Sequence, residues 1–107
     1  MTTRTGIEVL SSIRATARRI LPEGSRVVLF GSQARGEARE DSDWDLLLLV
    51  EKKNSWTDAF SRYAYPFVEL GWQNGTEVNP LLYTFEEWEE RSKTPFYLNV
   101  EKDGVEI

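Results

Sequence analysis

The sequence predicts an α/β or α+β fold in which a central mixed β-sheet is flanked by α-helices. Residues 4–21 and 55–71 carry apolar side chains at helical spacing, and residues 46–50 are five consecutive apolar residues. A run without alternation is typical of a strand buried on both faces, so we expect residues 43–50 to lie centrally in the sheet. Helix-like and strand-like segments alternate along the 107 residues, which we expect to form a single domain, 1–107.

The first half of the chain is expected to run helix, strand, short helix, strand. An amphipathic helix is predicted over residues 4–21, and Pro22 to Ser25 ends it. Residues 27–30 are apolar and include two valines, which predicts a short strand over residues 26–30. Residues 32–38 are expected to begin a short helix, and residues 43–50 form the second strand.

The second half begins with a helix over residues 55–71, which Pro66 should kink or split after Tyr65. A third strand is predicted over residues 76–83, where Pro80 indicates an edge position or a bulge. The aromatic stripe of the helix is expected to face the core: Trp56, Phe60, Tyr63 and Phe67.

The last elements are marked by their capping residues. Thr84 and Glu87 have the spacing of a capping box, which predicts a helix that continues to about Lys93. Pro95 is expected to open a final short helix, and Gly104 to end it.

Composition excludes several kinds of chemistry. The chain has no cysteine and no histidine, so it has no disulfide, no thiolate site and no imidazole base. Any catalysis must therefore use carboxylates, hydroxyls and a metal ion. The net charge of −5 argues against direct nucleic-acid binding. No signal peptide or membrane-spanning segment is evident, so we expect a cytoplasmic protein that does not enter a membrane.

The dipeptide Gly31-Ser32 follows the first predicted strand and precedes a short helix. Backbone N–H groups at such a turn can bind a phosphate, and glycine allows close approach of the ligand. The alternative is an ordinary tight turn with Ser32 as the helix N-cap.

Asp43 and Asp45 stand two residues apart at the start of the second strand, so both carboxylates should point to the same face. Neighbouring carboxylates repel each other unless a cation lies between them, and Mg²⁺ accepts carboxylate and phosphate oxygens. The alternative is a pair of solvated charges at the strand's end.

The spacing of the two motifs resembles the signature of the DNA polymerase β-like nucleotidyltransferase superfamily. In this chain, Gly31-Ser32 is followed by ten residues and then by Asp43-Trp44-Asp45. The fuller pattern runs from Gly31 to Gly36 and continues at Ser42-Asp43-Trp44-Asp45-Leu46. It is similar to the minimal nucleotidyltransferases, which include antitoxin partners of HEPN-domain proteins. The close match covers residues 30–47.

This resemblance implies a nucleotidyltransferase-like fold and a division of roles among the motif residues. Gly31 and Ser32 would hold the triphosphate of a nucleotide, with ATP the expected donor. Asp43 and Asp45 would bind Mg²⁺ during transfer of a nucleoside monophosphate to a hydroxyl group. Arg35 matches the arginine of the family and would contact phosphate, unless it pairs with a nearby acid such as Asp41.

The chain departs from the family pattern at the third carboxylate that active members usually carry on a neighbouring strand. The best-matching position is Asn79, and an amide is a poorer ligand and base than a carboxylate. Glu77 lies two residues earlier and should face the same way, so it is the candidate third catalytic carboxylate. The alternative is that Glu77 is an exposed strand residue without a role.

Three functions remain open at this point. The first is an Mg²⁺-dependent nucleotidyltransferase that modifies a protein or a small molecule. The second is a weakly active or inactive binding module that acts as the antitoxin-like partner of a HEPN-domain protein. The third is one subunit of an antibiotic-modifying enzyme, although such enzymes usually carry an additional substrate domain. The sequence names neither the acceptor, the preferred nucleotide, the oligomeric state nor the partner.

Overall fold

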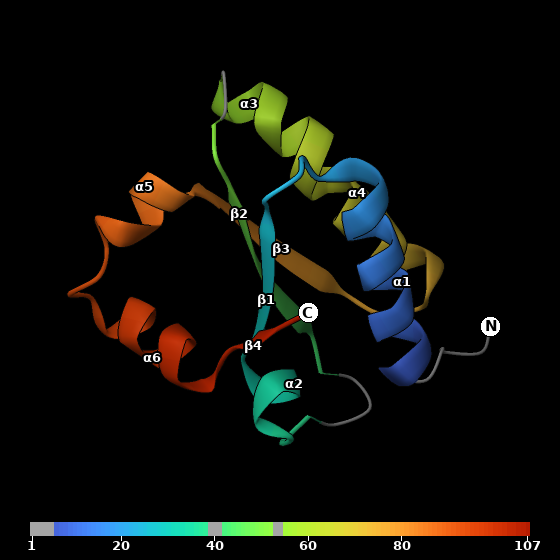
Figure 1. The fold of residues 1–107 in the computed structure, drawn as a ribbon. Helices are drawn as coiled ribbons and strands as arrows, with labels where there is room; N and C mark the ends of the chain where they lie inside the picture. Colours follow the sequence, from blue (N-terminus) through green and yellow to red (C-terminus); the bar gives the residue numbers. More distant parts are fainter. Residues whose placement is uncertain (1–5, 39–41, 53–54) are drawn as a thin grey trace.

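The computed structural model describes residues 6–38, 42–52 and 55–107 (Figure 1). Helices and strands alternate through most of the chain, which confirms the mixed α and β class. The elements are α1 (Gly6–Ile20), β1 (Arg26–Phe30), α2 (Ser32–Arg35), β2 (Trp44–Val50), α3 (Trp56–Ala59), the π-helical segment η1 (Phe60–Ala64), α4 (Tyr65–Gln73), β3 (Val78–Thr84), α5 (Phe85–Glu89), α6 (Pro95–Asp103) and β4 (Val105–Glu106).

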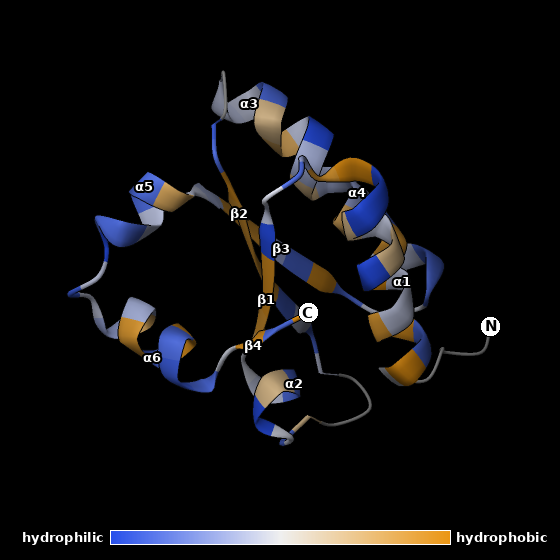
Figure 2. Cartoon of the chain, viewed as in Figure 1, coloured by the Kyte–Doolittle hydropathy of each residue, from blue (hydrophilic) through white to orange (hydrophobic). Residues whose placement is uncertain are grey.

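The four strands form one mixed sheet in the order β3-β2-β1-β4. Strand β2 runs parallel to β3 and antiparallel to β1, while β4 pairs antiparallel with the other side of β1. The central position of β2 is confirmed, and its apolar run is visible in Figure 2. Strand β3 lies at an edge, as Pro80 indicated, where a missing N–H costs the sheet least.

The two faces of the sheet are covered by different helices (Figure 1). Leu46 and Leu48 belong to a core with side chains from α1 and α4, such as Ile13. Leu47 packs on the other face against Trp88 of α5 and against α6. Because side chains alternate along a strand, Asp45 shares the face of Leu47. The start of β2 therefore presents its carboxylate on the α5–α6 side of the sheet.

The helix predicted over residues 55–71 is divided into α3, η1 and α4. The N–H of Tyr65 bonds to the carbonyl of Phe60, five residues back, which widens the turn. Pro66 falls in the first turn of α4, the part of a helix that accommodates proline most readily. The split predicted near Pro66 is thus a change from the π-helical turn η1 to the α-helix α4.

Three predictions need correction, and one further strand is present. The helix expected to continue to about Lys93 ends at Glu89. The helix expected over residues 32–38 ends at Arg35, because Gly36 takes a left-handed conformation and caps it. Trp56 is 60% exposed and stacks on Phe60 at the surface, whereas Phe67 is fully buried as expected. Strand β4 was not predicted.

In the described part of the chain, no helix is long and apolar enough to cross a membrane.

Candidate functional site

The turn after β1 and the start of β2 meet at one end of the sheet. Phe30 pairs with Asp45 in the antiparallel ladder, so Gly31 follows directly beside this carboxylate. A Cβ atom at position 31 would lie 2.5 Å from Oδ2 of Asp45. Gly31 also has φ 77° and ψ −158°, a conformation that is essentially restricted to glycine. The positive φ therefore requires glycine at this position, and any side chain here would force the Asp45 carboxylate to move.

Gly31, and not Ser32, is the N-cap of α2, so the alternative that made Ser32 the cap is wrong. The Gly31 carbonyl accepts hydrogen bonds from the N–H groups of Ala34 and Arg35, at 3.1 and 3.2 Å. Because Gly31 has no capping side chain, no acceptor from the cap competes for the N–H groups of Ser32 and Gln33, the first two residues of the helix. A helix of four residues has little macrodipole, so these individual N–H groups are what a phosphate would meet.

A side-chain contact ties α2 to the segment that leads into β2. The Gln33 amide donates from Nε2 to the carbonyl of Ser42, at 3.4 Å. This contact joins the two halves of the candidate site across the loop between them. Sequence reasoning assigned no role to Gln33, because its type and position carry no signal that predicts this contact.

Asp43, Asp45 and Asn79 come together across the parallel pair β2–β3. Asp45 and Asn79 are register partners, and Nδ2 of Asn79 donates to Oδ2 of Asp43 at 3.2 Å. Asp43 is exposed and Asp45 is half-buried. The amide thus donates to one of the two carboxylates and stabilises its negative charge without adding a third charge.

Glu77 lies just before β3, and its carbonyl accepts from the N–H of Trp44 at 2.9 Å. This bond holds the backbone of Glu77 beside the start of β2, while the residue itself is exposed. Over the residues that the structure describes, no three Asp, Glu, His or Cys side chains gather in a way that could hold a metal ion. The role of Glu77 as a third carboxylate therefore stays a prediction.

Arg35, the remaining phosphate-binding candidate, lies at the end of α2. Its Nε donates to Oε1 of Glu37 at 3.3 Å, and both side chains are well exposed. Such a surface pair contributes at most about 1 kcal/mol, so Arg35 can exchange Glu37 for a phosphate at little cost. Asp41, the other partner considered for Arg35, lies outside the described residues.

The donor set of this site fits Mg²⁺. Asp43 and Asp45 offer carboxylate oxygens on one face of the strand, and Mg²⁺ typically uses one or two carboxylates together with phosphate oxygens. The hydrogen bond from Asn79 occupies one oxygen of Asp43 and leaves the other oxygens of the pair for a cation. Asp43 and Asp45 are the residues that would hold the ion.

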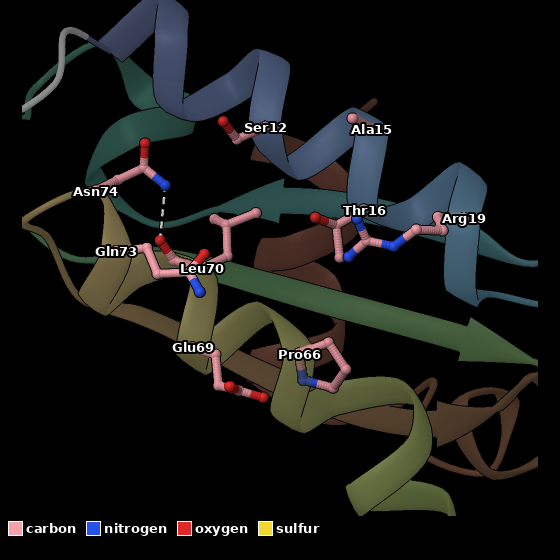
Figure 3. Close-up of a pocket in the computed structure, with 9 residues that line it drawn as sticks. All are labelled: Ser12, Ala15, Thr16, Arg19, Pro66, Glu69, Leu70, Gln73 and Asn74. Carbon is pink, nitrogen blue, oxygen red and sulfur yellow. Dashed lines mark hydrogen bonds between the residues drawn. The ribbon is translucent and has the colours of Figure 1, made fainter.

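A cavity of about 190 Å³ adjoins the site and is lined by residues of β1, α2 and α6, including Gly31 and Arg35. A larger hollow of about 380 Å³ lies between α1 and α4, where Thr16, Arg19 and Glu69 contribute to its walls (Figure 3). This second hollow is on the opposite face of the sheet, and none of the predicted site residues lines it. The smaller cavity is therefore the one connected with the motif.

The chain is similar to known proteins over most of its length. The nucleotidyltransferase domain family matches residues 10–103. A protein of Methanocaldococcus jannaschii named "Putative protein adenylyltransferase" is 32% identical over 108 residues, which cover 94% of this chain and 97% of that protein.

Two solved structures have a similar fold. The crystal structure of a toxin-antitoxin with AMP-PNP has a TM-score of 0.62 and 17% identity, covering 90% of this chain and 69% of that one. A structure named "putative minimal nucleotidyltransferase" has a TM-score of 0.54 and 29% identity, covering 92% and 88%. The family match spans nearly the whole chain and includes the Gly31 turn and both aspartates, and it confirms the predicted fold and enzyme class. The chain belongs to the nucleotidyltransferase domain family.

Proposed function

We propose that this protein transfers a nucleoside monophosphate from ATP to a hydroxyl group of a protein or a small molecule, in a reaction that requires Mg²⁺. The observation that carries the proposal is the close approach of the Gly31 turn to Asp45, since the turn is the candidate phosphate site and Asp45 a candidate ligand of the metal. The name of the M. jannaschii relative and the AMP-PNP in the toxin-antitoxin structure support ATP as the donor and a protein as the acceptor.

The residues of the site divide the work of this reaction. The N–H groups that follow Gly31, the Ser32 hydroxyl and Arg35 would bind and orient the triphosphate. When bound by Asp43 and Asp45, Mg²⁺ would polarise the phosphoryl oxygens and neutralise developing charge.

The acceptor oxygen forms a bond to the α-phosphorus as the bond to the departing pyrophosphate breaks. The proton of the acceptor hydroxyl passes to a carboxylate or to water, and Glu77 is the candidate carboxylate.

A second function is favoured by one observation, the amide at position 79. Asn79 lies where the register places a third site residue beside Asp45, and it is bonded to Asp43. A protein with this arrangement could bind a nucleotide and a HEPN-type partner without transferring the nucleotide. The toxin-antitoxin complex among the structural neighbours supports keeping this alternative.

Incubation with ATP labelled at the α-phosphate separates the two functions. The enzyme proposal predicts Mg²⁺-dependent label on an acceptor protein and release of pyrophosphate, both abolished by Asp45→Asn. If Glu77 is the third carboxylate, Glu77→Gln lowers the transfer rate by about 100-fold or more.

The exposed residue Glu69 on α4 provides a matched control, because Glu69→Gln removes a carboxylate from the other face of the sheet. Nucleotide binding without transfer to any acceptor, including the product of the adjacent gene, would favour the binding module. A rate that Glu77→Gln leaves unchanged would show that Glu77 has no part in the reaction.

A further inference from the structure

The cavity beside the Gly31 turn is lined partly by residues that the proposed binding of phosphate does not use. Gly31 and Arg35 line one part of it, and Phe30 and residues of α6 line the rest. Its volume of about 190 Å³ is below the roughly 300 Å³ typical of pockets that enclose a whole drug-sized ligand. It is therefore suited to one part of a nucleotide and not to all of it.

The α6 side of the cavity is a single helix face. Phe96, Asn99, Val100 and Asp103 follow the i, i+3, i+4, i+7 spacing that places side chains on one side of a helix. Val100 is buried beneath them and fixes this face against the sheet. The helix thus presents an aromatic ring, an amide and a carboxylate to the cavity.

The aromatic part of the wall offers a surface for stacking. The rings of Phe30 and Phe96 meet edge to face, with centroids 5.5 Å apart, and Phe96 also packs edge to face on the buried Trp88. Phe96 is held by these contacts yet remains 38% exposed. A held and partly exposed ring is the kind of surface on which a nucleobase stacks.

The charge differs between the two parts of the cavity wall. Arg35, a candidate phosphate ligand, belongs to the α2 part, and Asp103 belongs to the α6 part. The α6 part carries no positive side chain among the residues that line it, so it suits a neutral ring system better than a polyanion. Phe30 is the register partner of Asp45, so the cavity begins one strand, or about 5 Å, away from the carboxylates.

We propose that this cavity is the base subsite of the nucleotide site, with Phe96 and Phe30 forming the stacking wall and Asn99 selecting adenine. The proposal rests on the proposed function, since it names the residues that choose the nucleotide. A side-chain amide has a donor and an acceptor that match N7 and the 6-amino group of adenine, whereas guanine offers only acceptors at the same positions. Asn99 is then a specificity-determining residue, and the triphosphate extends from the base to Gly31 and Asp45.

Calorimetry with ATP, GTP and inorganic tripolyphosphate, each with Mg²⁺, tests this assignment in wild type and in Asn99→Ala. We expect wild type to bind ATP about tenfold more tightly than GTP, and tripolyphosphate more weakly than either nucleotide. Asn99→Ala should remove the preference for ATP and leave the affinities for GTP and tripolyphosphate unchanged. Leu98→Ala is the matched control, because Leu98 is exposed on α6 and does not line the cavity.

The outcomes distinguish this inference from the function on which it rests. Tight ATP binding with an ATP-to-GTP ratio that Asn99→Ala does not change would overturn the assignment of Asn99 and leave the proposed function standing. Equal binding of ATP, GTP and tripolyphosphate by wild type would overturn the base subsite as a whole. Failure of wild type to bind any of the three would overturn the proposed function and this inference together.

Discussion

At the scale of the residue, the identity of position 79 decides how the site behaves without a metal. A third carboxylate here would lie against Asp43 and Asp45 and would need a cation to offset the repulsion. Asn79 instead adds no charge and donates a hydrogen bond to Asp43, so the repulsion without a metal is limited to that between the two aspartates. The same amide removes one anionic ligand, which makes bound phosphate more important for holding a cation.

We therefore expect Asn79→Asp to destabilise the metal-free protein by about 1 kcal/mol, the scale of a like-charge contact near water. Mg²⁺ should reverse this loss and should bind the variant more tightly than it binds wild type. Thermal unfolding with and without Mg²⁺ measures both effects. Asn79→Ala is the control, because it removes the hydrogen bond without adding charge. If Mg²⁺ stabilises Asn79→Asp no more than it stabilises Asn79→Ala, this explanation is wrong.

Gly31 can be tested against another glycine with positive φ. Alanine at either position should lower the free energy of unfolding by about 1–3 kcal/mol, because a side chain is disfavoured at the positive φ of Gly31 (77°) and of Gly24 (86°). Only the added Cβ at position 31 meets Asp45, since no atom lies within 4 Å of the one at position 24.

The expected result is that Gly31→Ala weakens binding of Mg²⁺-ATP by more than about tenfold, while Gly24→Ala binds it as wild type does. Calorimetry on variants shown to be folded by circular dichroism measures the difference. Unimpaired binding by folded Gly31→Ala would exclude the turn from the nucleotide site.

At the scale of the element, the close approach of α4 to β3 sets the position of the strand that carries Asn79. A Cβ atom on Gly71 would lie 2.9 Å from the backbone nitrogen of Val78 and 3.1 Å from the carbonyl oxygen of Thr76. The backbone would have to move to admit even a methyl group. The packing of helix against strand therefore depends on glycine at this position.

Gly71→Ala is expected to destabilise the protein by about 1–3 kcal/mol, because overpacking against backbone cannot be relieved by a side-chain rotation. Urea unfolding measures this loss. Gln73→Ala, at the exposed end of the same helix, should change stability by less than about 0.5 kcal/mol. Equal effects of the two substitutions would mean that the contact between Gly71 and Val78 does not limit the packing.

The elements that could be predicted are those whose signals are local. The valine-rich run gave strand 26–30 with its exact bounds, and Thr84 with Glu87 forms the predicted capping box. Strand β4 has only two residues, both exposed, and is defined by its antiparallel pairing with Val28 and Leu29 of β1. No local pattern marks so short a strand.

In the candidate site, too, the contacts that motif spacing indicates could be predicted, and those that depend on strand pairing could not. The motif spacing predicted that Gly31 and Asp45 would share a site, and the register confirms that they lie together. The bond between Asn79 and Asp43 depends on the parallel pairing of β2 with β3, which spacing along the chain does not fix. The contact of Gln33 with Ser42 likewise joins two segments whose approach no local pattern in the sequence indicates.

At the scale of the whole molecule, the sheet separates a face that is closed by helices from a face that carries the candidate site. Helices α1 and α4 close one face over a continuous apolar core. Helices α5 and α6 cover the other face around Trp88 and leave the ends of β1 and β2 accessible beside α6 (Figure 1). The motif residues and the adjoining cavity lie at this one end, so a ligand can contact both.

The most direct test of the account is the dependence of ATP binding on Mg²⁺, measured by calorimetry in wild type, Asp43→Asn and the surface control Asp58→Asn. Asp58 is exposed on α3, away from the motif. Because two carboxylates form an incomplete site that phosphate oxygens complete, wild type and Asp58→Asn should bind ATP at least about tenfold more tightly with Mg²⁺ than without it. Asp43→Asn should lose this difference. Equal ATP affinity with and without Mg²⁺ in wild type, or unchanged Mg²⁺-ATP binding by Asp43→Asn, would contradict the account.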